Sequence, residues 1–187
     1  PDLNFKATNV NLQDGLQFDI DYQGAIYPFN VHYKGFYNIY NILASVSAAV
    51  LLGVNINSTA KILDDYTPQI GRMETFDLGK PVILNLSKNP AGFNQAISTL
   101  LQDNRSKDVL IVINDNAQDG TDISWIWDVN FEKMAESNIN GYIVSGIRKE
   151  DVLVRLKYAG ISTSQVIMEK DIKTALLSLI NGSGEVC

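Results

Sequence analysis

Beyond residue 80 the chain changes repeatedly from a short apolar run to a segment with helical spacing. Residues 109–113 are almost uniformly apolar, as a strand covered on both faces should be. Residues 81–86, 141–144 and 165–168 form further short runs bounded by helical patterns or turn residues. Four strands that alternate with helices predict an α/β fold with a doubly wound, mostly parallel sheet.

Helix ends in this part of the chain are predicted from their capping residues. Asn89 caps a helix that has Pro90 at its first position and runs to about residue 101. Further helices are expected at 131–137, at 149–159 with Gly160 as the stop, and at 172–180. Residues 182–187 are expected to be a frayed tail.

The first third of the chain has a different pattern. Residues 3–31 alternate between apolar and polar side chains, and Asp14-Gly15 and Gln23-Gly24 are turn signals, so an antiparallel meander is expected. From Gly35 the spacing becomes helical and stops at Gly53, and Ser58 is expected to cap a short helix over 59–65. Residues 66–71, with a proline and a glycine, predict a linker and a domain boundary after residue 70.

Composition excludes several functions. The net charge of −6 and the pI near 4.7 argue against nucleic acid as a partner and against direct docking on anionic lipid. Cys187 is the single cysteine, which excludes disulfides and cysteine metal clusters and fits a reducing cytosol. The longest apolar run, 42–54, is too short to span a bilayer.

Pro1 without a methionine indicates a truncated or proteolysed product.

Known catalytic motifs are missing from the sequence. His32 is the single histidine and is expected to be structural, so no Ser-His-Asp or Cys-His set can be complete within the chain. Neither the GxxxxGK[ST] phosphate loop nor the GxGxxG fingerprint is present.

Ligands of an open parallel sheet gather at the carboxyl ends of its strands, and there the sequence is acidic. Asp115, Asp119 and Asp122 follow the predicted strand 109–113, and they could bind a metal, orient a base or hold an ammonium-like group. An acidic turn that caps its own backbone is an equal alternative. Next come Trp125, Trp127 and Asp128, which suggest an aromatic partner surface, unless one or both tryptophans belong to the core.

Three further groups have polar side chains suited to a nucleotide. Lys88 precedes the helix that Asn89 opens, which is a workable anion site, although Asn-Pro commonly just opens a helix. Arg72 follows the linker and could reach a nucleotide, although a structural ion pair is the commoner role. Asn38 and Asn41 share one helix face and suit the edge of an adenine, with capping as the alternative for Asn38.

In combination these motifs resemble the Mur ligase family across the whole chain. Residues 35–41 are similar to the family's Gly-x-x-Asn-x-x-Asn helix, 71–74 to its Gly-Arg-x-Glu linker, and 89–90 to its Asn-Pro helix start. Residues 89–94, 115–128 and 155–160 resemble the MurT branch specifically. The resemblance implies that 1–70 is the C-terminal remnant of the central ATPase domain and that 71–187 is a Rossmann-like C-terminal domain.

The resemblance also implies an activity. In the MurT branch, ATP phosphorylates the α-carboxylate of D-glutamate in the lipid II stem peptide, and ammonia from a GatD-type glutaminase converts it to D-isoglutamine. An aspartate of the 115–128 segment, Asp115 or Asp119, would complete the glutaminase's Cys-His pair, with Asp122 as a further candidate. The protein would act in the cytoplasm, at the inner face of the membrane.

Binding roles follow from the same resemblance. Asn41 and Arg72 would contact adenine and ribose, supported by Asn38 and Lys88, and Asn89 would contact the substrate. The partner surface would consist of Trp125, Trp127 and Asp128. ATP and Mg²⁺ are expected, with most ligands outside this chain, and Zn²⁺ only in the full-length protein.

The sequence departs from the family pattern at two places. Tyr37 stands where amino-acid-adding Mur ligases usually have histidine, and the part of the central domain that carries the phosphate loop is absent. This chain alone should therefore not hydrolyse ATP. The alternatives are an amino-acid-adding Mur or folylpolyglutamate-type ligase, which should lack the 115–128 pattern, and a module that only docks a glutaminase.

Overall fold

The computed structural model describes residues 4–12, 15–32, 35–66, 71–135 and 137–187. The chain divides into two compact units, Pro1–Met73 and Glu74–Cys187. The boundary predicted after residue 70 lies at the edge of a segment outside the described residues. None of the helices in the described ranges is long and apolar enough to cross a membrane.

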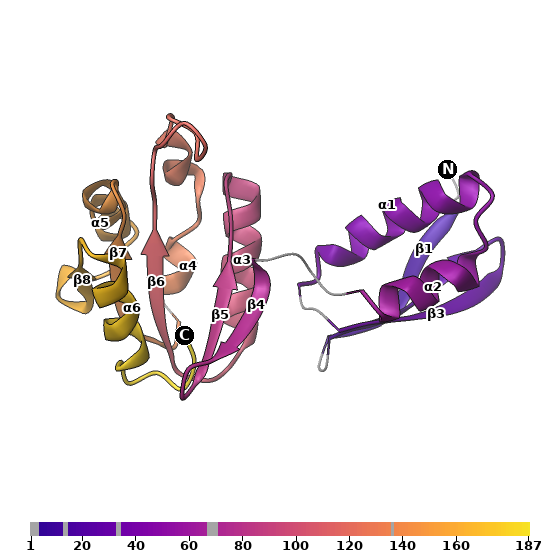
Figure 1. The fold of residues 1–187 in the computed structure, drawn as a ribbon, viewed down its shortest axis with the longest axis horizontal. Helices are drawn as coiled ribbons and strands as arrows, with labels where there is room; N and C mark the ends of the chain where they lie inside the picture. Colours follow the sequence, from indigo (N-terminus) through magenta and orange to yellow (C-terminus); the bar gives the residue numbers. More distant parts are fainter. Residues whose placement is uncertain (1–3, 13–14, 33–34, 67–70, 136) are drawn as a thin grey trace. The chain divides into compact units, whose positions relative to one another are not determined.

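The first unit begins with a three-stranded antiparallel sheet in the order β1 (Phe5–Asn11), β2 (Leu16–Tyr22) and β3 (Ala25–Val31) (Figure 1). Gln23 and Gly24, which join β2 to β3, both have positive φ, as a tight hairpin with matched twist requires. The predicted meander is confirmed.

One face of this sheet is covered by two helices, α1 (Asn38–Leu51) and α2 (Ile56–Asp64). Alternation along β2 places Leu16, Phe18 and Ile20 on the covered face, where they are buried in one core with residues of both helices. The predicted helix that ends before Gly53 is confirmed as α1.

The start of α2 differs from the prediction. Ser58 was expected to cap this helix, and that expectation is wrong, because Asn55 caps it instead. The Asn55 side-chain oxygen accepts a hydrogen bond from the backbone N–H of Asn57 at 2.8 Å. Starting the helix three residues earlier lets Ile56 join the core of the unit.

The second unit alternates strands and helices. In chain order these are β4 (Arg72–Asp77), β5 (Pro81–Asn85), α3 (Pro90–Gln102), β6 (Lys107–Val112), the 3-10 turn η1 (Ser124–Asp128), α4 (Glu132–Ala135), β7 (Ile139–Ser145), α5 (Lys149–Tyr158), the 3-10 turn η2 (Thr163–Gln165), β8 (Val166–Met168) and α6 (Ile172–Ile180). Strands β6, β7 and β8 form a parallel sheet in that order, and β4 pairs with β5. The predicted α/β fold is confirmed.

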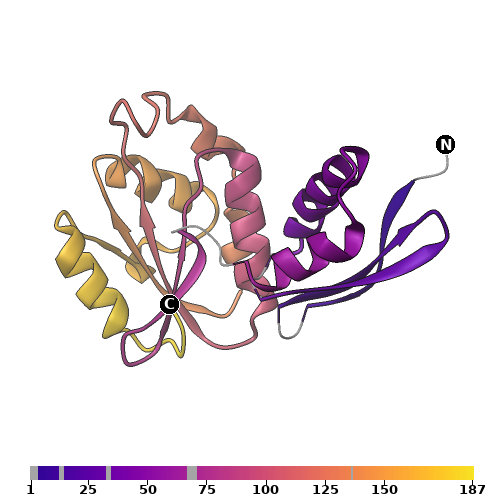
Figure 2. The same ribbon diagram turned by 45° about the vertical axis from the view of Figure 1, so that its right-hand side comes forward.

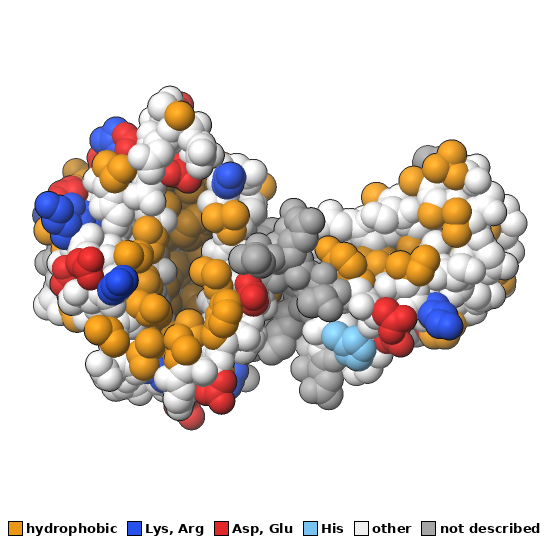
Figure 3. Space-filling view, viewed as in Figure 1, with side chains coloured by type: hydrophobic (Ala, Val, Ile, Leu, Met, Phe, Trp, Pro, Cys, Tyr) orange, Lys and Arg blue, Asp and Glu red, His pale blue; other side chains and the backbone are white. Residues whose placement is uncertain are grey.

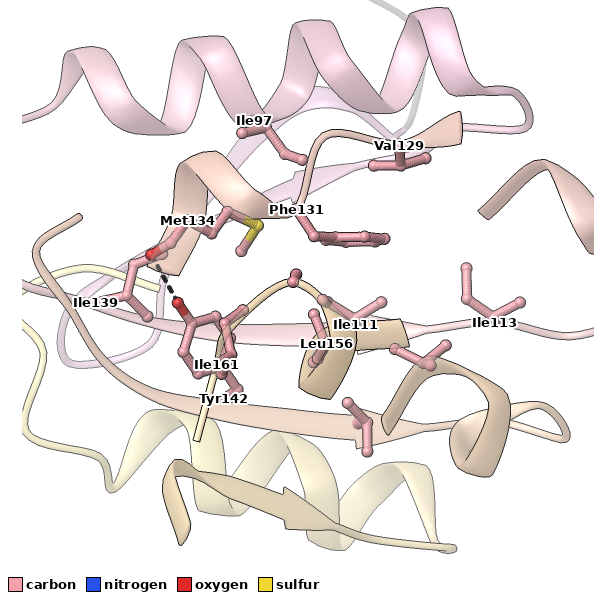
Figure 4. Packing of buried hydrophobic residues seen from close by; sticks show 13 residues of the cluster. Ile97, Ile111, Ile113, Val129, Phe131, Met134, Ile139, Tyr142, Leu156 and Ile161 are labelled. Atoms are coloured by element: carbon pink, nitrogen blue, oxygen red, sulfur yellow. Dashed lines mark hydrogen bonds between the residues drawn. The ribbon is translucent and has the colours of Figure 1, made fainter. Parts of the chain in front are cut away.

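Helices cover both faces of the parallel sheet (Figure 2). On one face, Ile97 of α3, Met134 of α4 and Leu156 of α5 pack against apolar side chains of β6 and β7 (Figure 4). Ala175 and Leu179 of α6 pack on the other face. This two-sided cover explains why the run 109–113 is apolar at nearly every position.

A buried tyrosine links the core beneath α3, α4 and α5 to the backbone of α4. The hydroxyl of Tyr142 donates a hydrogen bond to the carbonyl of Met134 at 2.9 Å (Figure 4). Burial raises the pKa of Tyr142 to about 12. The phenol therefore stays neutral and keeps β7 attached to α4.

Strand β4 was not predicted. It precedes β5 and is joined to it by the short turn 78–80. Only two of its six residues, Met73 and Phe76, are apolar, so the segment lacks the dense apolar pattern of the central strands. A strand at the margin of a sheet needs less apolar surface, which is why the pattern did not identify it.

The expected frayed tail is instead fixed, and that expectation is wrong. Val186 and Cys187 are buried, and the backbone N–H of Gly184 donates to Oδ2 of Asp108 at 2.6 Å. A Cβ at Gly184 would lie 2.6 Å from the backbone nitrogen of Asp108, so the glycine permits this close approach. The glycines that suggested a flexible end allow the tail to pack.

Candidate functional site

Residues that follow the strands of the second unit meet at one edge of its sheet, which we term the carboxyl-end edge. Asn114 and Asp115 come after β6, and the segment 146–148 comes after β7. Because β6 and β7 are parallel, these two segments are neighbours. Figure 1 shows β5 ending at the same edge, so residues 87–89 also lie there.

Asp115 is held by an arginine from the neighbouring strand end. Nε of Arg148 donates a hydrogen bond to Oδ2 of Asp115 at 2.8 Å, and Nη2 forms an ion pair with the same oxygen at 2.5 Å. Arg148 also lies 3.6 Å from Asp151, one turn into α5. The Asp115 side chain is about one-fifth exposed, at 22%. It is therefore an oriented carboxylate that can still be reached from solvent.

The backbone around this pair is fixed as well. The side-chain oxygen of Asn114 accepts a hydrogen bond from the backbone N–H of Ile147, and the carbonyl of Ile113 accepts one from Arg148, both at 3.0 Å. Gly146 has a φ of 92°, and a Cβ there would collide with the Ile113 carbonyl. The β7–α5 turn thus needs glycine to bring Arg148 beside Asp115.

The other two aspartates of the acidic segment make local contacts. Asp119 accepts a hydrogen bond from the Asn116 side chain at 3.0 Å. Asp122 accepts one from the backbone N–H of Ser124 at 2.8 Å, and this bond lowers the pKa of Asp122. Both contacts are local, and that of Asp122 caps a backbone N–H, as in the alternative interpretation of this segment as an acidic turn.

Within the described ranges, no three side chains of His, Cys, Asp or Glu are gathered closely enough to hold a metal ion. Asp115 faces the cation of Arg148, which supplies the positive charge at this carboxylate.

The two tryptophans of η1 have different environments. Trp125 packs against the core, with its ring centre 6.1 Å from that of Phe93. Trp127 is 51% exposed and makes an edge contact at 5.7 Å with Tyr158, which is also exposed. Asp128 lies beside it and is exposed. The candidate partner surface is therefore Trp127, Asp128 and Tyr158.

Arg155 fixes the η1 turn, although sequence reasoning gave it no such role. Its side chain is buried, and it donates to the carbonyls of Ile126 and Val129 at 3.2 and 2.5 Å. It also pairs with Glu132 at 2.8 Å and lies 5.7 Å from the ring centre of Trp127. This network holds the exposed tryptophan against α5.

The predicted anion site at the start of α3 is polar and open. Lys88 and Asn89 are both exposed. Asn89 is the N-cap, because its side-chain oxygen accepts a hydrogen bond from the backbone N–H of Gly92 at 2.8 Å. The structure thus confirms the capping role of Asn89 and leaves Lys88 at a helix N-terminus.

The nucleotide candidates of the first unit lie at the start of α1. The side-chain amide of Asn41 donates to the side-chain oxygen of Asn38 at 3.2 Å, so these two residues form a pair on one helix face, as expected. The N-cap of α1 is Tyr37, and its side chain makes no capping hydrogen bond. Arg72 begins β4, and its side chain lies outside the described part of the structure.

Comparison with known proteins identifies the family. Residues 86–186, more than half of the chain, match the family described as MurT ligase C-terminal. The chain belongs to the MurT ligase C-terminal family. The predicted resemblance to the MurT branch is confirmed, and the match includes both the acidic segment and the η1 turn.

Named relatives include MurT subunits from two bacteria. The subunit MurT of the lipid II isoglutaminyl synthase (glutamine-hydrolyzing) of Staphylococcus aureus is 37% identical over 83% of this chain and 36% of its own length. The corresponding Streptococcus pneumoniae subunit is 32% identical over 97% of this chain and 40% of its own length. The chain thus spans less than half the length of these relatives.

Solved structures of similar fold come from related ligases. MurF of Acinetobacter baumannii has a TM-score of 0.74 and 23% identity, over 95% of this chain and 38% of that one. Folylpolyglutamate synthase of Mycobacterium tuberculosis, complexed with ADP, has a TM-score of 0.74 and 16% identity, over 96% and 40%. At these identities the likeness shows the fold alone.

For this MurT-family chain, sequence reasoning missed the two arginines that hold the site. Arg148 stands just after a predicted strand, so its position relative to the strand end was a usable signal. Arg155 lies within a predicted helix, 23 residues from its partner Glu132 and 29 from Ile126. No local pattern marks such contacts, because they depend on the tertiary fold.

Proposed function

We propose that this chain is part of an ATP-dependent ligase that amidates the α-carboxylate of D-glutamate in the lipid II stem peptide. The family match, with 37% and 32% identity to subunits of lipid II isoglutaminyl synthase, is the observation that carries the proposal. We place the reaction at the cytoplasmic face of the membrane, and we propose residues 1–70 and 71–187 as the central-domain remnant and the C-terminal domain.

The proposed chemistry activates a carboxylate for attack by ammonia. Transfer of the γ-phosphoryl group of ATP to a carboxylate oxygen forms an acyl phosphate. Ammonia then attacks the acyl carbon, the bond to the phosphate oxygen breaks, and inorganic phosphate leaves with the electron pair while the nitrogen loses a proton. Water must be excluded, because it would attack the same carbon.

The nucleotide contacts would come from both units. The paired amides of Asn38 and Asn41 offer donors and acceptors that suit the edge of adenine. Arg72 is proposed for the ribose and Lys88, exposed at the start of α3, for an anionic group. Asn89, whose side chain caps α3, is the candidate for substrate contact. Ligands for Mg²⁺ and Zn²⁺ are proposed to lie elsewhere in the full-length protein.

The acidic segment is proposed to serve a GatD-type glutaminase subunit. Such a partner would have a Cys-His pair, and an aspartate from this chain would orient the histidine and stabilise its protonated form. Asp115 fits this role best, because Arg148 fixes one carboxylate oxygen while the side chain stays partly exposed. Asp119 and Asp122 remain weaker candidates, since each is engaged in a local turn.

The docking surface is proposed to be the exposed part of η1 and α5. Trp127 and Tyr158 offer a rigid aromatic contact of the kind enriched at protein interfaces, and Asp128 adds an exposed charge beside it. Trp125 was also proposed for this surface, and its packing against Phe93 supports an indirect contribution, as the buried support of the turn.

The alternative ligases share the fold and differ in the acidic segment. An amino-acid-adding Mur or folylpolyglutamate-type enzyme would not use glutamine-derived ammonia, so Asp115 would have no catalytic effect. A chain that only docks a glutaminase would need neither Asn41 nor Arg72. The nitrogen source therefore separates the proposed function from the first alternative, and the effect of changing Arg72 separates it from the second.

The test uses the full-length protein with its glutaminase partner, ATP and a lipid II substrate. Amidation is measured once with glutamine and once with ammonium chloride as the nitrogen source. We expect Asp115→Asn to abolish glutamine-dependent amidation and to leave ammonia-dependent amidation near the wild-type rate. Arg72→Ala should weaken both, because ATP is required in each case.

Asp119→Asn is the matched control, since it removes a carboxylate four residues away in the same segment. An Asp115→Asn protein that retains glutamine-dependent amidation would contradict the split-site proposal. Failure of the wild-type complex to amidate with either nitrogen source would contradict the ligase assignment itself.

A further inference from the structure

The carboxyl-end edge carries charged side chains of both signs. Figure 3, viewed as in Figure 1, shows acidic and basic side chains close together at the top of the second unit, around the ends of β6 and β7. Arg148 belongs to two charged contacts there, one with Asp115 after β6 and one with Asp151 of α5. An arginine shared by two carboxylates can set both the orientation and the net charge of a site.

The backbone of Arg148 is fixed on both sides. Its N–H donates to the carbonyl of Ile113 at 3.0 Å, and its carbonyl accepts a hydrogen bond from the N–H of Val152 at 3.1 Å. The first bond attaches Arg148 to the end of β6, and the second belongs to the first turn of α5, whose N-cap is Arg148. The side chain therefore starts from a point that is fixed relative to Asp115.

The guanidinium group of Arg148 has contacts on two of its edges. Nε and Nη2 face Oδ2 of Asp115 at 2.8 and 2.5 Å, whereas Nη1 lies 3.6 Å from Oδ2 of Asp151. Because the group is planar, carboxylates at two edges restrict the direction of its plane. Asp151 thus helps to hold Arg148 in the orientation in which it meets Asp115.

Both contacts from Arg148 go to the same oxygen of Asp115. In the part of the chain that the structure describes, no group donates a hydrogen bond to the other oxygen, Oδ1. In a catalytic triad one carboxylate oxygen accepts the Nδ1–H of the histidine and so fixes the tautomer and the orientation of the ring. Arg148 therefore determines which oxygen of Asp115 is left for a histidine of the partner.

Arg148 and Asp151 also set the charge beside Asp115. Arg148 balances the charge of Asp115, and Asp151 adds one negative charge. The other charged residues of this edge and of α5 make separate contacts or are exposed. They are Lys149 and Glu150, which pair with each other, Arg155 and Glu132, which also pair, Asp119 and Asp122 in the acidic segment, Glu169, Lys170 and Asp171 after β8, and Lys88 before α3.

We propose that Arg148 is a positioning residue for glutamine hydrolysis by the partner subunit, and that Asp151 supports it. Arg148 turns Oδ1 of Asp115 towards the partner's histidine and, together with Asp151, sets the net charge that this histidine meets. This inference rests on the role proposed above for Asp115.

The charge matters because the histidine carries the proton of the reaction. It takes the proton of the cysteine thiol, and the thiolate forms a bond to the side-chain amide carbon of glutamine. The carbon–nitrogen bond breaks, the nitrogen takes the proton from the histidine, and ammonia leaves; water then releases glutamate from the thioester. A nearby cation lowers the pKa values of the Cys-His pair and a nearby anion raises them, so both move the pH profile of hydrolysis.

The test measures glutamine hydrolysis against pH for complexes of the full-length protein with its glutaminase partner, each confirmed by gel filtration. Arg148→Met removes the charge and the donors. We expect kcat to fall about ten-fold or more, and the pH profile to move upwards by roughly 0.5 unit. Arg148→Lys keeps the charge but lacks the planar fork, so kcat should fall while the profile stays in place.

Asp151→Asn tests the charge with the opposite sign. Asparagine keeps an oxygen for Arg148 and removes one negative charge, so the pH profile should move downwards by roughly 0.3 unit, with kcat within about two-fold of the wild type. Glu150→Gln is the matched control. It removes a carboxylate one residue earlier in α5 that pairs with Lys149, and it should change neither kcat nor the profile.

Opposite shifts for Arg148→Met and Asp151→Asn support the proposal, because a loss of folded protein lowers the rate without moving the profile. Profiles of both variants that coincide with the wild type, or a wild-type kcat for Arg148→Lys, would overturn it even where Asp115→Asn abolishes hydrolysis. Unchanged hydrolysis by Asp115→Asn would instead remove the role of Asp115 itself. If Arg148→Met forms no complex, Arg148→Lys and Asp151→Asn decide by the same criteria.

Discussion

The two edges of the second unit's sheet hold their charged residues in different ways. At the amino-end edge, defined by Lys80, Lys107 and Asp108, the side chains are largely or fully buried and their charges are enclosed by backbone groups. At the carboxyl-end edge, Asp115 and Arg148 pair while both stay partly exposed. The comparison indicates that one edge stabilises the fold and the other is free to act on a partner or ligand.

The amino-end edge is closed by interactions with the tail. Nζ of Lys80 donates to the carbonyls of Gly182 and Gly184 at 2.9 Å and lies 3.6 Å from Oδ2 of Asp108. Nζ of Lys107 donates to the carbonyls of Asp103 and Arg105 at 2.5 and 2.7 Å. Buried charges are tolerated only with such complete sets of partners.

The largest loss of stability should follow Asp108→Ala. This change leaves the Lys80 ammonium and the Gly184 N–H without their shared acceptor in a buried setting, so we expect the free energy of unfolding to fall by about 3 kcal/mol. The free energy of unfolding is measured by denaturation in urea. Asp151→Ala, an exposed carboxylate near Arg148, is the matched control and should change stability by no more than about 0.5 kcal/mol. Equal effects of both variants would remove the distinction between the edges.

A second test at the amino-end edge is Lys107→Met. Methionine keeps most of the buried stem but leaves the carbonyls of Asp103 and Arg105 without their donor. We expect a loss of about 2 kcal/mol in the free energy of unfolding. Lys149→Met, at the start of α5, provides the comparison, since Lys149 pairs with the exposed Glu150. A neutral Lys107→Met would mean that these hydrogen bonds contribute little.

The ionisation of Asp103 should make the free energy of unfolding depend on pH. The side-chain hydrogen bond from Arg105 lowers the pKa of Asp103 from 3.8 to about 2. A carboxylate with a lowered folded-state pKa stabilises the fold above its unfolded pKa, and the contribution is lost as the pH falls from 3.8 towards about 2. Unfolding in urea between pH 5 and pH 2 should therefore show a shallower loss for Asp103→Asn than for the wild type. Superimposable pH profiles would contradict this origin.

Only a small change in stability is expected for Asp115→Asn. Its partner Arg148 is partly exposed and keeps its contact with Asp151. The free energy of unfolding should therefore fall by less than about 1 kcal/mol. Thermal unfolding of the variant and the wild type provides the measurement. A loss as large as that of Asp108→Ala would show that the carboxyl-end edge is also a stabilising network.

Sequence patterns identified the elements whose signals are local. The apolar run 109–113, the Asn89 cap and the turn at Gln23-Gly24 each correspond to the expected structure. Residues whose role depends on distant contacts were not identified. Arg155 reaches Ile126 and Val129 only after α5 packs beside η1, and its spacing within the helix gives no sign of that.

The acidic segment illustrates the same limit at the candidate site. Its three aspartates look equivalent in the sequence, but the fold places Arg148 beside Asp115 and leaves Asp119 and Asp122 in a local turn. The tail was misjudged for a related reason. Gly182 and Gly184 suggested flexibility, whereas the structure uses them where side chains would collide with Asp108.

Asp115 is proposed to act in the active site of a glutaminase partner. Its most direct test is the rate of glutamine hydrolysis by the complex of full-length protein and partner, with complex formation confirmed for each variant. We predict that Asp115→Asn lowers this rate on the order of 10⁴-fold, the loss typical of replacing the aspartate of a Ser-His-Asp triad by asparagine, while Asp119→Asn stays close to the wild type. An unchanged rate for Asp115→Asn in a stable complex would contradict the claim.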